Sequence, residues 1–274
     1  VYNIRSIGKI WFVIVRDGTG YVQCVVTKND VSDKVFKLEN SLTQESSLKI
    51  KGTVQADTRS DSGVEILVTD IDVVHIADEY PISLKEHGVS FLMDNRHLWL
   101  RSKKQFAIMK IRHQLIRSIR NFFDDRDFVL IDSPIFTANA VEGTTTLFET
   151  DYFNRSAYLS QSGQLYQEAG AIAFGKTYCF GPVFRAEKSK TRKHLTEFWM
   201  VEPEMAYCDI NQNMDIIEEF MSNVIKDTLD NCVDELKILE RDVSKLENIS
   251  APFPRISYDE AVDILSKKGH EFQY

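Results

Sequence analysis

Apolar and polar residues alternate with a period of two along much of the first quarter of the chain. Residues 47–54 and 64–74 follow this pattern, which is typical of β-strands with one buried face, and the mostly apolar residues 10–15 and 21–26 also predict strands. Residues 16–20, with the sequence Arg-Asp-Gly-Thr-Gly, are typical of a tight turn between the first two strands. Several short strands with one intervening polar segment predict a small β-barrel such as the OB fold. The chain opens in strand-like sequence, so we expect the first strand of this barrel to be incomplete.

Further along the chain the pattern changes to helical spacing. Beyond Ser102, apolar residues recur every three or four positions, which predicts a long amphipathic helix. An aspartate-rich segment then ends the helix, and residues 128–131 are predicted to form a strand that leads to Pro134. Residues 214–229 and 258–265 predict two further helices.

These patterns predict an α+β protein in two domains. We expect an OB-fold β-barrel over residues 1–77, a hinge over residues 78–98, and a domain with an antiparallel sheet flanked by helices over residues 99–274. The sequence shows no internal repeat and no low-complexity segment.

Composition and charge narrow the class of protein. The 274 residues are 43% hydrophobic and 27% charged, which is typical of a globular chain. No apolar run reaches about 18 residues and no targeting prefix is visible, so we expect no membrane association. The four cysteines are widely spaced, which favours buried reduced thiols over disulfides or zinc and indicates the cytoplasm. Residues 1–77 hold nine Lys/Arg against ten Asp/Glu, so an RNA contact there would need stacking as well as charge.

Residues 180–207 carry the strongest functional pattern. They read as a strand that ends in Arg185 and Glu187, a cationic loop over residues 188–193, and a second strand that opens with Glu197 and Phe198. An arginine can hold a phosphate through two parallel hydrogen bonds, and an aromatic ring can stack on a base. The pattern therefore predicts a nucleotide pocket. It also resembles the second motif of the class II aminoacyl-tRNA synthetases, in particular the asparaginyl members of the aspartyl, asparaginyl and lysyl group.

The resemblance implies a role for each residue of this motif. Arg185 would contact both the α-phosphate of ATP and the attacking carboxylate, Glu187 would accept from the adenine amino group, and Phe198 would stack on adenine. Lys193, His194 and Leu195 would lie near the terminal phosphates, and Lys190 and Arg192 would reach the pyrophosphate or the tRNA acceptor end. Without the resemblance, the histidine would be read as a surface residue, the loop as a solvated face and Phe198 as core.

Residues 160–167, with the sequence Ser-Gln-Ser-Gly-Gln-Leu-Tyr-Gln, resemble the amino-acid pocket of this group. The resemblance implies that Glu142, on a glycine-containing loop, meets the α-ammonium group of the substrate. It also assigns Ser162 and Gln164 to the substrate. The aspartyl relatives carry a lysine where this chain has Gln167, and an aspartate where it has Glu202. An aspartate substrate would leave its charge unpaired beside Gln167, and Glu202 can accept from an amide NH2 but repels a carboxylate. We therefore expect asparagine as the substrate.

The resemblance extends to the barrel and to the long helix. Phe12, Arg16 and Gln23 stand where the group reads the central anticodon base, although Phe12 could instead fill the barrel. Pro134 stands where the first motif of the family ends at a homodimer interface. The third motif, Gly-x-Gly-x-x-Arg, is absent from the sequence, so we expect the chain to be part of a longer protein whose Mg²⁺ ligands lie beyond Tyr274.

The implied function is the ATP-dependent ligation of asparagine to tRNA(Asn) through an asparaginyl-adenylate. Two alternatives remain open: an aspartyl-tRNA synthetase, and a non-catalytic fragment that binds tRNA or dimerises. A third relative, the synthetase-like enzyme that makes asparagine from aspartate, lacks the barrel, so residues 1–77 argue against it.

Overall fold

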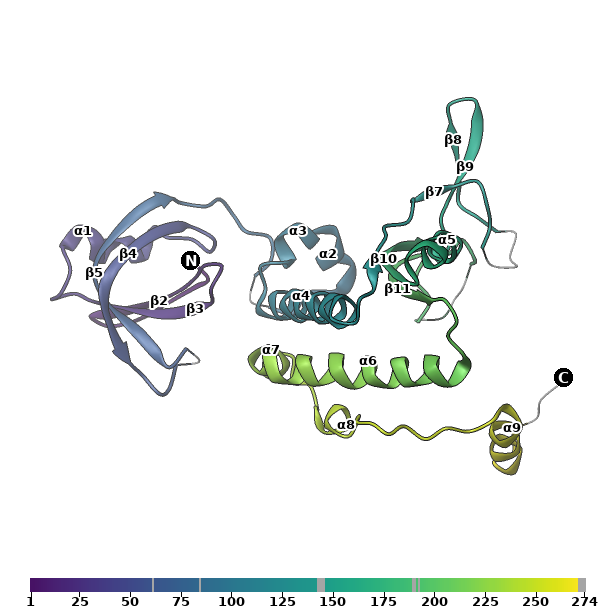
Figure 1. The fold of residues 1–274 in the computed structure, drawn as a ribbon. Coiled ribbons are helices and arrows are strands. Elements are labelled where there is room, and N and C mark those ends of the chain that lie inside the picture. Colours follow the sequence, from purple (N-terminus) through teal and green to yellow (C-terminus); the bar gives the residue numbers. More distant parts are fainter. Residues whose placement is uncertain (61, 84, 142–145, 189–190, 192, 271–274) are drawn as a thin grey trace. The chain divides into compact units, whose positions relative to one another are not determined.

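The computed structural model describes residues 1–274 except 61, 84, 142–145, 189–190, 192 and 271–274. The chain divides into two compact units, Val1–Leu100 and Arg101–Tyr274, which are described separately below (Figure 1). Three of the expected site residues, Glu142, Lys190 and Arg192, lie outside the described residues.

The first unit is built around one five-stranded sheet with the order β1-β2-β3-β5-β4. Its strands are β1 (Asn3–Ile7), β2 (Ile10–Arg16), β3 (Tyr21–Thr27), β4 (Ser47–Ala56) and β5 (Val64–His75). Neighbouring strands are antiparallel except β3 and β5, which run parallel. The four strands predicted from the sequence therefore correspond to β2, β3, β4 and β5, and β1 precedes them.

Alternation decides which side chains fill this unit. Trp11, Val13, Cys24 and Val26 are completely buried on one face of the sheet and form its core together with Val68. The first residue is bonded to the segment before β4, because its amino group donates to the Ser46 carbonyl at 2.7 Å and its carbonyl accepts from the Glu45 N–H at 2.7 Å.

Short helices complete the first unit. They are α1 (Asp33–Phe36), the 3₁₀ helix η1 (Lys37–Asn40), α2 (Val89–Asp94) and α3 (Arg96–Trp99). The last two lie in the region predicted as a hinge, for which the sequence pattern indicated no helix. The hydroxyl of Tyr80 donates to the Leu98 carbonyl at 3.0 Å and ties the start of this region to α3.

The second unit combines helices with two small sheets. Its helices are α4 (Lys103–Asp124), α5 (Gln164–Phe174), α6 (Ile210–Asn231), α7 (Val233–Ile238), α8 (Ser244–Glu247) and α9 (Tyr258–Lys267). Its strands are β6 (Val129–Leu130), β7 (Phe136–Thr137), β8 (Glu149–Tyr152), β9 (Arg155–Leu159), β10 (Lys176–Phe184) and β11 (Glu197–Met205). The sheets have the orders β11-β10-β6 and β7-β9-β8, and Figure 1 shows β8 and β9 as a projecting hairpin.

An aromatic cluster joins α4 and α6 to one face of the β10–β11 pair. Phe122, Phe123, Phe128 and Tyr178 are buried together, and Phe220 of α6 packs against them. The Tyr178 hydroxyl donates to Asp124 at 2.8 Å, and burial with this neighbouring carboxylate raises the pKa of Tyr178 to about 12. Because α4 and α6 cover this face, the opposite face of β10 and β11 is left for α5 and for the predicted site.

The long helix begins as the sequence predicts. The Ser102 side chain caps it by accepting from the Gln105 N–H at 3.3 Å, and the left-handed residue Asp127 (φ 62°) follows its end. The strand that follows the helix, β6, is short, and it pairs parallel with β10 through Val129 and Thr177. The predicted α+β fold is confirmed.

Candidate active site and nucleic-acid interface

The predicted nucleotide motif forms an antiparallel ladder, β10–β11, whose register places its key residues on one face. Val183 lies opposite Phe198, and Cys179 lies opposite Glu202. Arg185 follows β10 two positions after Val183, and its N–H donates to the Thr196 carbonyl at 2.9 Å, which continues the ladder. Since residues two apart on a strand share a face, Arg185, Phe198 and Glu202 lie on the side opposite the aromatic cluster.

Glu202 lies at the closed end of this face, held by the start of α5. The Gly163 N–H donates to both of its carboxylate oxygens, at 2.9 and 3.1 Å, and the Ser162 hydroxyl donates to Oε2. The Cys179 thiol lies 3.6 Å from Oε1 and also donates to it. The carboxylate is therefore fixed by three neighbouring donors. It is half-buried.

The side chain of Gln167, a residue of α5, is completely buried and does not reach solvent. Its Nε2 donates to the Ile131 carbonyl at 2.7 Å and lies 3.4 Å from the Ser133 hydroxyl. Its Oε1 is buried and has no hydrogen-bond partner in the described part of the chain. A buried acceptor without a partner is costly in a folded protein and indicates a place where a donor from outside can bind.

The space below the start of α5 is tightly packed. A Cβ added to Gly163 would lie 2.5 Å from both the Cys179 Sγ and the Ser133 Oγ, so only glycine fits there. A cavity of about 230 Å³ lies beside it, lined by Ser133, Pro134, Cys179 and Glu202 among others. Burial and then the nearby Glu202 raise the pKa of the Cys179 thiol to about 12, so the thiol stays protonated.

The other expected residues lie around this face. Gln164 is exposed and donates to Glu168 at 3.0 Å, and Pro134 is exposed after β6. Glu187, Lys193, His194 and Leu195 are all exposed, and the His194 ring is hydrogen-bonded to the Thr191 hydroxyl. The rim of the site is therefore open to solvent, and its inner end is closed.

A second set of side chains lies on the outer face of the first unit. Phe12 is half-buried on the face opposite Trp11 and Val13, so it does not fill the core. The Arg5 guanidinium lies 4.7 Å from the Phe12 ring centre and donates to Gln23 Oε1 at 2.7 Å. Two of the three predicted anticodon residues are thus brought together by Arg5.

The sequence interpretation did not include Arg5. The two-residue loop between Ile7 and Ile10, with Gly8 at φ 63°, sets the register that pairs Arg5 with Phe12. That glycine was the signal that could have identified Arg5. Arg16, which was predicted, instead forms an ion pair with Glu45 at 2.5 Å.

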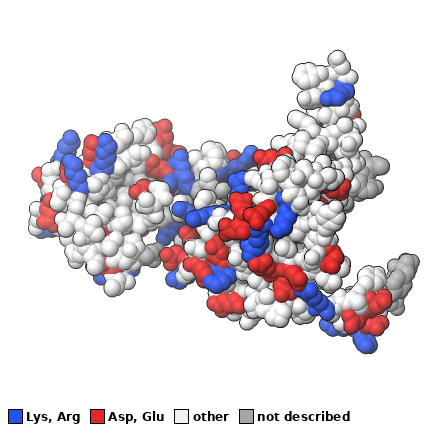
Figure 2. All heavy atoms as spheres, in the orientation of Figure 1, with Lys and Arg blue, Asp and Glu red and all other residues white. Residues whose placement is uncertain are grey.

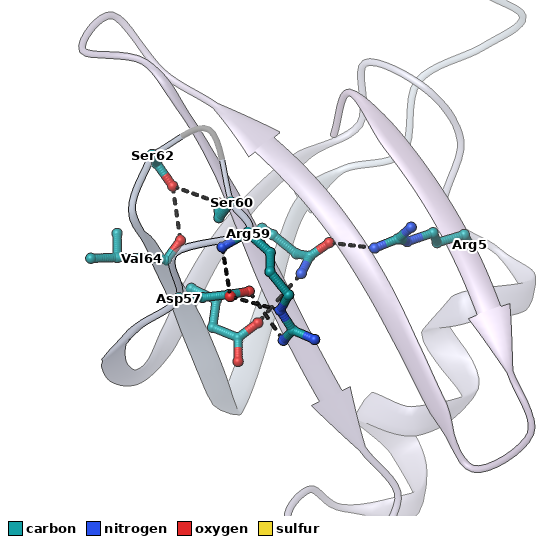
Figure 3. Close-up of polar contacts among 8 residues, drawn as sticks. Arg5, Asp57, Arg59, Ser60, Ser62 and Val64 are labelled. Atoms are coloured by element: carbon teal, nitrogen blue, oxygen red, sulfur yellow. Dashed lines mark hydrogen bonds and ion pairs between the residues drawn. The ribbon is translucent and has the colours of Figure 1, made fainter.

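Charges beside this face are of both signs. Gln23 Nε2 lies 3.4 Å from Glu65, and Arg59 Nε donates to Asp57 at 2.9 Å in the turn between β4 and β5. Figure 3 shows Arg5 reaching across its neighbouring strand, and Asp57 with Arg59 in that turn. On the face drawn in Figure 2, basic and acidic side chains are interspersed over the first unit. Binding of RNA here would depend on stacking and directed hydrogen bonds more than on net charge.

The fold and the site define a class of protein: an OB-fold module joined to an α+β unit with an arginine and an aromatic ring on one sheet face. Two family descriptions match it. "tRNA synthetases class II (D, K and N)" matches residues 88–274, and "OB-fold nucleic acid binding domain" matches residues 1–74. The chain belongs to the class II tRNA synthetases of the D, K and N group.

Individual relatives agree with this family. The asparagine–tRNA ligase of Pelotomaculum thermopropionicum is 55% identical over 274 residues, which are 100% of this chain and 64% of that protein. A crystal structure of asparaginyl-tRNA synthetase from Pyrococcus horikoshii, complexed with asparaginyl-adenylate, has a TM-score of 0.92 and 41% identity over 100% of this chain and 63% of that one. The Entamoeba histolytica enzyme in complex with asparaginyl-adenylate has a TM-score of 0.82 and 28% identity over 98% of this chain and 62% of that one. The chain thus spans less than two thirds of the length of these relatives.

Two further features concern metals and membranes. Within the described ranges, no group of three or more His, Cys, Asp and Glu side chains could hold a metal ion. No helix in the same residues is long and apolar enough to cross a lipid bilayer. Cys24, Cys179, Cys208 and Cys232 are free thiols, of which Cys24, Cys179 and Cys232 are buried and Cys208 is half-buried.

Proposed function

We propose that the protein of which this chain forms at least a part ligates asparagine to tRNA(Asn), using ATP. The observation that carries the proposal is the ladder register that places Arg185, Phe198 and Glu202 on one face. The 55% identity to an asparagine–tRNA ligase over the whole chain supports the same assignment.

In the first step, a carboxylate oxygen of asparagine attacks the α-phosphorus of ATP. The bond from that phosphorus to the bridging oxygen breaks, so that pyrophosphate leaves and asparaginyl-adenylate remains. Arg185 holds the α-phosphate and the attacking carboxylate together, and Phe198 stacks on adenine. Glu187 accepts from the adenine amino group, and Lys193, His194 and Leu195 border the terminal phosphates. Placement and charge neutralisation lower the barrier, and the step needs no protein nucleophile.

In the second step, a hydroxyl of the terminal tRNA ribose attacks the carbonyl carbon of the adenylate, and AMP leaves. The anticodon is read on the outer face of the first unit, where Phe12 and Gln23 lie on either side of Arg5. An aromatic ring that stacks on a base contributes about 1–3 kcal/mol. We include Arg5 in this interface because it contacts the Phe12 ring and donates to Gln23 Oε1.

Asparagine is preferred to aspartate because the inner end of the site offers hydrogen-bond acceptors. Glu202 accepts from an amide NH2 and repels a carboxylate. Gln167 is uncharged and cannot neutralise a substrate anion. Ser162 and Gln164 lie at the start of α5, where they can contact the backbone groups of the amino acid.

Three further expected properties of the protein are its metal ion, its oligomeric state and its location in the cell. ATP enters with Mg²⁺, and no cluster of His, Cys, Asp and Glu among the described residues could hold the metal by itself. The protein forms a homodimer through the segment that ends at Pro134, which is exposed. It acts in the cytoplasm, in keeping with its four free thiols.

The test is ATP–pyrophosphate exchange by the full gene product, with asparagine and aspartate assayed in parallel. We expect exchange with asparagine, with kcat/KM higher than for aspartate by at least about a hundredfold. Faster exchange with aspartate would replace the proposal by the aspartyl alternative. Binding of tRNA without exchange on either amino acid would indicate a non-catalytic role.

A further inference from the structure

A network of hydrogen bonds connects Gln167, which is completely buried, with Glu202, which lines the cavity. Gln167 Nε2 lies 3.4 Å from the Ser133 hydroxyl, and that hydroxyl is hydrogen-bonded to the Cys179 thiol. The thiol in turn lies 3.6 Å from Glu202 Oε1. The sequence interpretation included neither Ser133 nor Cys179.

The two ends of this hydrogen-bond network fix the direction in which its groups donate. The Ile131 carbonyl can only accept, so the Gln167 group that lies 2.7 Å from it must be the NH2 and not the oxygen. At the other end, an ionised Glu202 can only accept. The thiol between them stays protonated, because burial raises its pKa to about 12. Each group therefore donates towards Glu202.

This direction determines what the inner end of the site offers to a ligand. The amide of Gln167 is held with its Oε1 unpaired among the described residues. Glu202 is held with its oxygens toward the donors at the start of α5. The cavity thus presents the acceptor oxygens of Glu202, which suit a carboxamide NH2, while Gln167 Oε1 stays buried.

We propose that Ser133 and Cys179 are positioning residues for amino-acid selection, which hold the Glu202 carboxylate as an acceptor for the substrate carboxamide. The inference rests on the proposed function and deepens it. An aspartate side chain brings no donor for Glu202, and its charge would be repelled by the carboxylate that these residues hold in place. A site built of hydrogen-bonding groups rejects such an analogue more strongly than a merely apolar pocket could.

The test compares Cys179→Ala and Cys179→Ser in the full gene product, by ATP–pyrophosphate exchange with asparagine and with aspartate. Alanine removes the donor, and serine keeps one. We expect Cys179→Ala to raise the KM for asparagine about fivefold with little change in kcat, as the loss of one hydrogen bond of about 1 kcal/mol predicts. The preference for asparagine over aspartate should fall, and Cys179→Ser should remain close to the wild type.

Ser133→Ala gives a second test that removes one half-buried hydroxyl, and we expect it to raise the KM for asparagine in the same direction. Unchanged KM values in Cys179→Ala and Ser133→Ala, while the wild type activates asparagine, would overturn the inference and leave the proposed function standing. Equal loss of kcat and of thermal stability in Cys179→Ala and Cys179→Ser would also overturn it, because it would indicate a packing role. A wild type that does not activate asparagine would overturn both.

Discussion

Replacing Phe12 by alanine should separate RNA recognition from amino-acid activation. Phe12 is half-buried on the outer face of the sheet, and the core on the other face is filled by Trp11 and Val13. The ring therefore adds little to the core, and its one described partner is the Arg5 guanidinium at 4.7 Å. Losing that contact costs about 0.5–1 kcal/mol of stability.

The effect on RNA should be larger. A stacked base is worth about 1–3 kcal/mol, which corresponds to a weakening of tRNA binding by about 5- to 150-fold. The measurement is the dissociation constant of the full gene product for tRNA(Asn), made at one fixed salt concentration. Asparagine-dependent ATP–pyrophosphate exchange should stay within about twofold of the wild type, since the ring lies in the other unit.

Ile14→Ala is the matched control, because Ile14 is half-buried on the same face of the same strand and has no aromatic ring. We expect it to lower stability by a similar amount and to change tRNA binding by less than about threefold. Equal losses of tRNA affinity in the two variants would refute the stacking role. So would a Phe12→Ala protein whose free energy of unfolding falls by about 3–5 kcal/mol, as expected of a core aromatic residue.

Three further outcomes are expected. Arg185→Ala should abolish asparagine-dependent exchange and Arg185→Lys should restore only a small part of it, because lysine cannot form two parallel bonds; near-normal exchange in the alanine variant would exclude the assigned role. Gly163→Ala should lower the free energy of unfolding by about 1–3 kcal/mol, measured by chemical denaturation, because its Cβ would lie 2.5 Å from Cys179 and Ser133; an unchanged midpoint would contradict that packing. Burial, and then Glu168 and Glu202, raise the pKa of Glu204, so its contribution to stability is present below its unfolded pKa and is lost as pH rises through the folded value. Glu204→Gln should therefore raise Tm at neutral pH, with a gain that vanishes below about pH 4, and a gain that is independent of pH would refute this cause.

Short-range sequence patterns were enough to predict the strands of the first unit and the start of α4. The strands followed from apolar runs and alternation, and the start of α4 followed from helical spacing after Ser102, which caps the helix. The helices α2 and α3 were missed, because a short apolar segment such as 89–99 has no clear period and its conformation depends on the contacts it makes.

The residues of the candidate site divide in the same way. Side chains along a strand alternate between its two faces, so counting positions along a single strand shows which face each residue occupies. This places Phe12 on β2, and Phe198 and Glu202 on β11, on the face opposite the buried core. Arg16 lies on the same face of β2 as Phe12, yet it forms an ion pair with Glu45. Glu45 belongs to a distant segment of the chain, so the alternation of residues along β2 could not have identified this pair.

Arg5, Ser133 and Cys179 depend on register between strands instead. Arg5 meets Phe12 only because the loop at Gly8 has two residues, and Ser133 meets Cys179 only because β6 runs parallel to β10 with Val129 beside Thr177. A shift of either pairing by one residue would turn these side chains to the other face while leaving every strand intact. Residue types along the chain therefore suffice to predict which side chains share a sheet face, whereas the side chains that contact them from other strands follow from how the strands are paired.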